Sequence, residues 1–201
     1  ITNVGDEILT LTSACHPNLP DLGTREIPFT QEIFIDAADF SEDPPKGFKR
    51  LVLGGEVRLR HSYVIRCDEV LKNAAGEVIE LRCSADLNTL GKNPEGRKVK
   101  GVIQWVSASA GVQAEVRLYD RLFTLPNPES GDDLLASLNP DAFQTLQAWV
   151  EPSLASAKPE DHFQFEREGY FVADLVDCVN GKLVFNKTVG LRDSWGVKGG
   201  D

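Results

Sequence analysis

The segment FKRLVLGGEVRLRHSYVI, residues 48–65, decides how this chain can fold. Along residues 56–65, apolar and polar side chains alternate with the two-residue period of a β-strand. In such a strand Arg58 and Arg60 project from the same face, opposite the apolar positions. The Gly-Gly pair at residues 54–55 is typical of a turn. The segment therefore predicts a strand that presents two guanidinium groups side by side.

The rest of the chain is also dominated by short β-type runs. We expect further strands at residues 7–11, 32–35, 77–83, 98–106, 114–118 and 182–189. The stretch VLKNAAGEVIELRC, residues 70–83, predicts a hairpin whose turn uses Asn73 and Gly76. Helix signals are short and lie at residues 39–42, 118–123, 131–137 and 141–149. Short strands separated by Gly and Pro turns indicate an all-β fold of sandwich or barrel type.

The chain length of 201 residues suffices for two small barrels. Pro-rich connections at residues 43–47 and 126–140 bracket the middle third. They predict a central, distal β-barrel of residues 46–125, inserted into an outer, proximal β-barrel built from both chain ends, residues 1–45 plus 126–201. Because the chain holds no Met and begins at Ile1, we expect it to be a piece of a longer protein.

Charge is distributed unevenly along the chain. The net charge of −10 taken alone disfavours nucleic acid, because phosphate contacts need Lys and Arg. Two segments depart from this average. The first basic island, residues 46–66, holds Lys46, Lys49, Arg50, Arg58, Arg60 and Arg66 against Glu56. The second basic island, residues 92–100, holds Lys92, Arg97, Lys98 and Lys100 against Glu95. They predict either a local anion-binding face or two solvated surfaces.

Catalytic and metal-binding patterns are missing from the sequence. It contains no GxSxG, HExxH or GxxxxGK[ST] string, and Cys15, Cys67, Cys83 and Cys178 form no CxxC pair. We therefore expect reduced, buried thiols, no catalytic residue and no metal site. No apolar run approaches the roughly 20 residues of a membrane helix. A cytoplasmic location is expected.

Two segments fit the recognition of single-stranded RNA. Residues 48–65 combine cations, strand alternation and a turn, as β-barrel proteins do when they present Arg forks to RNA. The segment FQFEREGYF, residues 163–171, interleaves aromatics with Gln164 and Arg167. For its aromatic side chains we expect positions in a hydrophobic core.

Seven blocks in the same order resemble the C-terminal, anticodon-binding half of glutaminyl-tRNA synthetase. They are HPN at 16–18, RLVLGGEVRLR at 50–60, GRKVKGVIQWVSA at 96–108, EVRLYDRLF at 115–123, EPSL at 151–154, FQFEREGYF at 163–171 and VFNKTVGLRDSW at 184–195. The resemblance covers nearly the whole chain. Ordered blocks of this number are far more specific than one short motif.

The resemblance implies two β-barrels of the ribosomal protein L25-like architecture that hold the three anticodon bases of glutamine tRNA in separate pockets. It places Arg58 on the first base, Gln164 and Arg167 on the central uridine, and Arg50 on the third-position guanine, with Lys49 and Arg60 as supports. It also implies an N-terminal catalytic domain of the same protein, where ATP and Mg act, and a monomer. No catalysis by this chain alone is expected.

Some residues depart from the family pattern. Gln104 stands where relatives often have His, and Ala110 with Gly111 replaces a His-containing pair. The HIGH-like and KMSKS-like motifs are missing, as is the family strand that carries another Arg for the central uridine. Three alternatives stay open at this point. They are the anticodon domain of a glutamyl-tRNA synthetase, a stand-alone rRNA-binding protein of the same fold, and a structural interaction domain.

Overall fold

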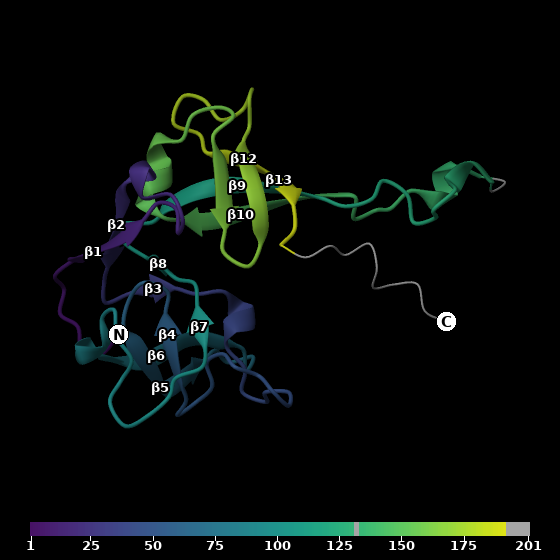
Figure 1. Ribbon diagram of the computed structural model, residues 1–201. Coiled ribbons are helices and arrows are strands. Elements are labelled where there is room, and N and C mark those ends of the chain that lie inside the picture. Colours follow the sequence, from purple (N-terminus) through teal and green to yellow (C-terminus); the bar gives the residue numbers. More distant parts are fainter. Residues whose placement is uncertain (131–132, 192–201) are drawn as a thin grey trace. The chain divides into compact units, whose positions relative to one another are not determined.

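The computed structural model describes residues 1–130 and 133–191, and the chain divides into two compact units (Figure 1). Unit 1 consists of residues 1–111 and 151–153, and unit 2 of residues 112–150 and 154–201. Both units are built from β-strands joined by turns and short 3-10 helices, which confirms the predicted all-β class. Within the described residues the strands pair into four open sheets and form no closed ring.

Unit 1 holds the first eight strands. They are β1 Leu9–Ala14, β2 Thr24–Phe29, β3 Ile33–Phe34, β4 Glu56–Leu59, β5 Val64–Lys72, β6 Val78–Asp86, β7 Val102–Ile103 and β8 Val106–Ser107, with 3-10 helices η1 Pro20–Leu22, η2 Ala37–Asp39 and η3 Leu87–Thr89. β1 pairs with β2, β3 pairs with β8, and a four-stranded sheet runs in the order β6-β5-β4-β7. The predicted hairpin at residues 70–83 is confirmed, since Asn73 and Gly76 form the turn between β5 and β6.

One hydrophobic core joins these sheets. It centres on fully buried side chains such as Phe29, Leu59 and Ile103. The Phe29 ring meets the Tyr63 and Trp105 rings edge-on, at centroid distances of 5.2 and 5.3 Å. The β1–β2 hairpin therefore packs into the same core as the central strands, because aromatic contacts of this geometry require close packing.

This core explains why the unit boundaries differ from the sequence-based ones. The prediction grouped residues 1–45 with residues 126–201, whereas the structure groups residues 1–111 into unit 1. Leu11 and Phe29 lie in one buried cluster with Leu51 of the middle segment. The Pro-rich segment at residues 43–47 therefore lies inside unit 1 and does not separate two units.

The predicted continuous strand at residues 56–65 is wrong, because the chain reverses within it. β4 ends at Leu59 and β5 begins at Val64. Between them, the N–H of Ser62 donates to the Leu59 carbonyl at 2.9 Å, and His61 has a φ of 58°. The alternation of apolar residues continues through this turn, so the pattern alone did not reveal it.

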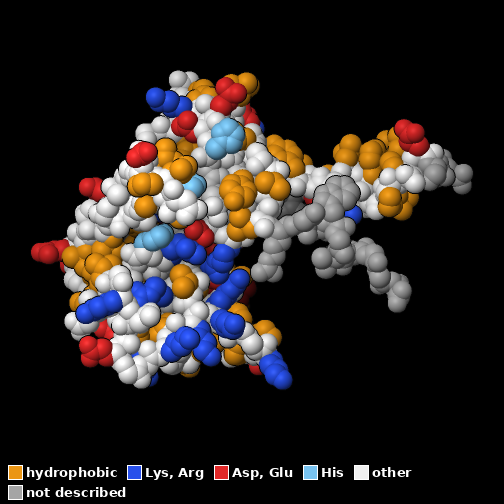
Figure 2. Space-filling model, viewed as in Figure 1, with side chains coloured by type: hydrophobic (Ala, Val, Ile, Leu, Met, Phe, Trp, Pro, Cys, Tyr) orange, Lys and Arg blue, Asp and Glu red, His pale blue; other side chains and the backbone are white. Residues whose placement is uncertain are grey.

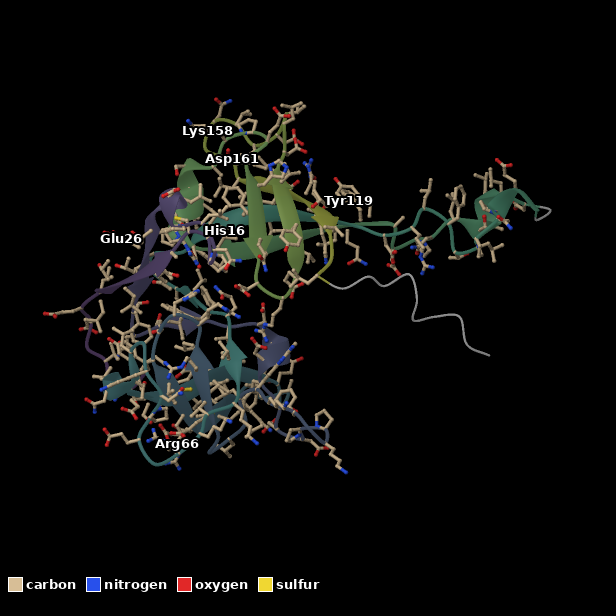
Figure 3. All side chains as sticks on the ribbon, viewed as in Figure 1. His16, Glu26, Arg66, Tyr119, Lys158 and Asp161 are labelled. Atoms are coloured by element: carbon tan, nitrogen blue, oxygen red, sulfur yellow. The ribbon has the colours of Figure 1, made fainter. Side chains whose placement is uncertain are left out.

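Unit 2 contains a five-stranded sheet in the order β10-β9-β13-β12-β11. The strands are β9 Val112–Tyr119, β10 Phe143–Val150, β11 His162–Phe165, β12 Gly169–Ala173 and β13 Val184–Val189, with 3-10 helices η4 Pro128–Ser130 and η5 Leu135–Ser137. A further 3-10 helix, η6 Pro152–Ser156, spans the boundary between the units. Tyr119, at the end of β9 (Figure 3), donates from its hydroxyl to Asn186 Oδ1 on β13 at 2.9 Å.

Phenylalanine rings contact one another in the core of unit 2. Phe165 stacks on Phe171 at a centroid distance of 4.3 Å, and Phe185 meets Phe163 edge-on at 5.5 Å. Phe171 and Phe185 are almost fully buried. The expectation that aromatics of residues 163–171 lie in a core is therefore confirmed for Phe163, Phe165 and Phe171.

Two predicted helices in unit 2 are wrong. Residues 141–149 lie largely in β10, which pairs with β9 from Phe143 opposite Tyr119 to Val150 opposite Val112. This ladder satisfies the backbone of β10 over its full length and overrides the weak local helix signal. Residues 118–123 likewise continue β9 and then turn. The predicted helix at residues 131–137 begins outside the described residues, and only the short η5 is seen there.

A half-buried ion network closes the connection between β12 and β13. Asp174 accepts hydrogen bonds from the Asn186 side chain and from the backbone N–H groups of Val176 and Asp177. These donors stabilise the carboxylate and lower the pKa of Asp174 to about 2. Arg117 on β9 reaches Asp177 at 2.6 Å and Asp174 at 3.3 Å. The loop is thereby tied to the middle of the sheet.

Gly101 offers a direct test of the packing in unit 1. A Cβ at this position would overlap the carbonyl oxygen of Lys49 and lie 3.0 Å from Val57 Cγ1. We therefore expect Gly101→Ala to lower the free energy of unfolding by about 1–3 kcal/mol in urea titrations. Gly5→Ala is the matched control, because no atom lies within 4 Å of a Cβ there. Equal stability of the two variants would contradict this close approach.

Candidate nucleic-acid interface

The pairing of β4 with β7 brings the two basic islands together in unit 1. The two strands run parallel, and the N–H groups of Arg58 and Arg60 donate to the carbonyls of Gly101 and Ile103, each at 2.9 Å. Because residue 101 directly follows the second basic island, this ladder places that island beside the first. Figure 2 shows Lys and Arg side chains gathered over the part of unit 1 that contains β4 and β7.

The single acid of the first basic island is neutralised by an arginine of the second. Arg97 Nε lies 2.9 Å from Glu56 Oε2, and Arg97 Nη2 lies 2.7 Å from Asp86 Oδ2. The two hydrogen bonds raise the pKa of Arg97, and the Arg97 guanidinium lowers the pKa of Asp86. The acid of the first island is therefore paired within the protein, while Lys49, Lys98 and Lys100 are exposed to solvent.

Arg58 joins the same two segments through its side chain. Its Nη1 donates to the carbonyls of Ser62 and Thr89, both at 2.8 Å, and its Nη2 donates to the carbonyl of Lys92 at 2.5 Å. These bonds occupy three of the five guanidinium protons. Within the described residues, the Nε proton and one Nη2 proton remain for a ligand. The side chain is therefore held in place before any ligand arrives.

An open pocket of about 730 Å³ adjoins Arg58. Its lining includes His61, Ser62, Lys92 and Asn93 together with residues 10–12 of β1. The hydroxyl of Ser62 is buried and has no hydrogen-bond partner within the described part of the chain. A buried polar atom without a partner is costly, so this hydroxyl destabilises unit 1 slightly.

Arg50 is held by a buried carboxylate. Its Nη1 lies 3.1 Å from Asp39 Oδ1 and donates to the Ala38 carbonyl at 2.9 Å. The Asp39 side chain is almost fully buried, whereas the Arg50 side chain is 39% exposed. The ion pair therefore fixes one end of the guanidinium and leaves the rest accessible.

The two predicted site residues of unit 2 share one hairpin. Gln164 lies on β11 and is exposed, and Arg167 lies in the β11–β12 turn with a φ of 66°. Gln164 faces Tyr170 across the strand pair, and Tyr170 is 47% exposed. Directly opposed residues point to the same side of a sheet. The hairpin thus combines an amide and an aromatic ring on one surface.

The six predicted residues therefore fall into two groups. Lys49, Arg50, Arg58 and Arg60 lie in unit 1, with Arg58 on β4, Arg60 directly after it, and Lys49 and Arg50 in the segment that precedes it. Gln164 and Arg167 lie in unit 2. Sequence reasoning missed the pocket residues His61, Ser62 and Asn93, and it missed the exposed Tyr170. Strand alternation could have separated Tyr170 from its buried neighbour Phe171, since the two point to opposite faces.

Other sites receive no support from the described residues. In residues 1–130 and 133–191 no group of three or more His, Cys, Asp or Glu side chains is arranged to hold a metal ion. Within the same ranges no helix is long and apolar enough to cross a membrane.

Comparison with protein-family models gives two matches. Residues 1–86 and residues 102–174 each match a model described as tRNA synthetases class I (E and Q), anti-codon binding domain. Together they cover most of the chain. The last block of the sequence resemblance, residues 184–195, lies beyond both matches, and its residues 192–195 lie outside the described residues.

Three curated relatives are each named glutamine-tRNA ligase. The glutamine-tRNA ligase of Ectopseudomonas mendocina is 64% identical over 185 residues, which cover 90% of this chain and 33% of that protein. The glutamine-tRNA ligase of Pseudomonas aeruginosa is 60% identical over 201 residues, which cover 98% of this chain and 36% of that protein. The glutamine-tRNA ligase of Azotobacter vinelandii is 60% identical over 185 residues, which cover 90% of this chain and 33% of that protein.

The chain spans about a third of the length of these relatives. The two family models and the basic face of unit 1 agree with the resemblance seen in the sequence. The chain belongs to the anticodon-binding domains of the class I tRNA synthetases for glutamate and glutamine.

Proposed function

We propose that this chain binds the anticodon loop of glutamine tRNA and holds its bases in separate pockets. The observation that carries the proposal is the union of two basic islands on one face of unit 1 by the β4–β7 ladder. Such a face attracts the phosphate backbone, while the acidic remainder of the chain disfavours non-specific RNA. The names of the relatives favour glutamine tRNA over glutamate tRNA.

The two anchored arginines suit base recognition. Arg50 is held through Nη1, and Arg58 is held through Nη1 and one Nη2 proton, which leaves each guanidinium its Nε proton and at least one Nη2 proton for a ligand. An Nε and Nη2 pair forms the planar fork that matches two adjacent acceptors on a base edge. We assign Arg58 to the first anticodon base and Arg50 to the third, with Lys49 and Arg60 as supporting cations. This assignment rests on the family resemblance together with these donor positions.

Unit 2 supplies a second type of contact. Gln164 can donate to and accept from a uracil edge, and we assign it to the central base together with Arg167. Tyr170, opposite Gln164, offers an exposed ring on which a base can stack. The hairpin therefore supplies both hydrogen bonds and a stacking surface.

The whole protein is proposed to act as a glutamine-tRNA ligase that uses ATP and Mg in a catalytic domain outside this chain. The relatives of that name are about three times as long as this chain, which supports the proposal. Base recognition would then be coupled to aminoacylation as a free-energy linkage between the two sites. The cytoplasmic location and the monomeric state stay predictions.

Removing Lys49 tests the electrostatic part of the proposal. We expect Lys49→Ala to weaken binding of a glutamine anticodon stem-loop about 3- to 10-fold near 0.1 M salt. We also expect the salt slope, which is the slope of the logarithm of the binding constant against the logarithm of the salt concentration, to become smaller in magnitude by roughly one. The measurement is fluorescence anisotropy across a salt series. Lys72→Ala is the matched control, because Lys72 lies outside both basic islands and pairs with Glu42 at 2.9 Å. Equal losses in the two variants would count against a localised face.

Replacing Tyr170 tests the contribution of unit 2. We expect Tyr170→Ala to weaken stem-loop binding by about 1–3 kcal/mol, the usual value of one stacked base, and Tyr170→Phe to bind like the wild type. Binding is measured by anisotropy, and thermal unfolding checks that both variants are folded. If the Ala variant is folded and binds with unchanged affinity, Tyr170 does not stack on a base.

A further inference from the structure

Two buried cysteines face each other in unit 1. Cys67 on β5 is the register partner of Cys83 on β6, and both thiols are free. Their side chains are almost completely buried in the same core cluster. Directly opposed residues in a sheet point to the same side, so the two sulfur atoms share one small region of the core.

Backbone hydrogen bonds show which type of cross-strand pair this is. Cys67 donates its N–H to Gly55 and accepts at its carbonyl from Gly54, both on the side away from β6. The Cys83 carbonyl accepts from Thr2, on the side away from β5. The two residues therefore form a non-hydrogen-bonded pair, the type in which opposed Cα atoms lie only about 4.5 Å apart.

This geometry permits a covalent link. Disulfides form between residues whose Cα atoms lie about 4.4–6.8 Å apart, and a non-hydrogen-bonded pair falls inside that range with its side chains parallel. Asp68 forms a bulge directly after Cys67, so the strand is already irregular at this point and can absorb a small adjustment. We propose that Cys67 and Cys83 form a reversible dithiol site that hydrogen peroxide slowly oxidises to a disulfide between β5 and β6.

The reaction balances with hydrogen peroxide as the oxidant. The sulfur of Cys67 attacks one peroxide oxygen, the O–O bond breaks, and a sulfenic acid and one water result. The Cys83 sulfur then attacks the Cys67 sulfur, the S–O bond breaks, and a second water leaves as the S–S bond forms. Two electrons pass from the thiols to the peroxide. A small neutral oxidant suits a site that is shielded from solvent.

Burial and the hydrogen bond between the two thiols determine the order and the rate of these steps. Burial raises the pKa of Cys67 and raises the pKa of Cys83 to about 12. A hydrogen bond from Cys83 partly offsets the rise for Cys67, which makes Cys67 the first nucleophile. Since the thiolate is the reactive form, oxidation should be slow compared with that of the exposed Cys15.

Peptide mapping of the peroxide-treated protein tests the proposal. After treatment, unfolding and alkylation, we expect a peptide in which Cys67 and Cys83 are linked with a loss of two hydrogen masses, and full reversal by dithiothreitol. Cys178, buried in unit 2, serves as the internal control and should stay alkylated as a thiol. Recovery of Cys67 and Cys83 as free thiols, or as separate sulfinic acids, would overturn the proposal.

A variant identifies the intermediate. In Cys83→Ser the second thiol is missing, so we expect peroxide to leave Cys67 as a sulfenic acid that dimedone traps. The matched variant Cys178→Ser should still form the Cys67–Cys83 link. If Cys83→Ser does not fold, the peptide map of the wild-type protein decides the question alone. A folded Cys83→Ser protein that gives no dimedone adduct at Cys67 would contradict the proposed order.

Discussion

The parallel ladder between β4 and β7 is the contact on which the proposed RNA-binding face depends. Next to this ladder, the backbone of Gly101 approaches the carbonyl of Lys49 so closely that a Cβ would collide with it. Parallel pairing joins segments that are distant in sequence, and here it joins the two basic islands of an acidic chain. The pairing concentrates the basic residues on one face, since each island alone would be an ordinary solvated surface.

The arginines of this face are held in place by the protein itself. Asp39 anchors Arg50, and the carbonyls of Ser62, Thr89 and Lys92 anchor Arg58. These internal contacts stabilise the fold, and each guanidinium also keeps donors without a partner among the described residues. Side chains fixed before binding lose less rotational entropy on contact with a ligand. The contacts therefore support both the fold and the recognition of bases.

Sequence patterns predicted the local elements better than their connections. The turn at Asn73 and Gly76 was predictable, because both residues have direct chemical reasons to be there. The reversal at His61 was not, because a non-Gly residue with positive φ leaves no mark in the alternation of apolar residues. β10 was mistaken for a helix because its conformation is imposed by β9, a partner that local propensity does not include.

The candidate site shows the same division. Charge and alternation singled out the basic island that holds Lys49, Arg50, Arg58 and Arg60, the family resemblance implied their roles, and the structure places them in unit 1. The pocket beside Arg58 could not be predicted, because Thr10, Ser62 and Lys92 come together only through tertiary packing. Tyr170 was not recognised, because the other aromatic residues of the same segment belong to the core of unit 2.

The most direct measurement of the central claim is the affinity of this protein for glutamine anticodon stem-loops in which one anticodon base at a time is exchanged. If anchored arginines read bases on a shared basic face, each exchange should weaken binding by about 1–3 kcal/mol while the salt slope stays the same. Equal affinity for all stem-loops, with an unchanged salt slope, would show that the face binds only phosphate and would contradict base recognition.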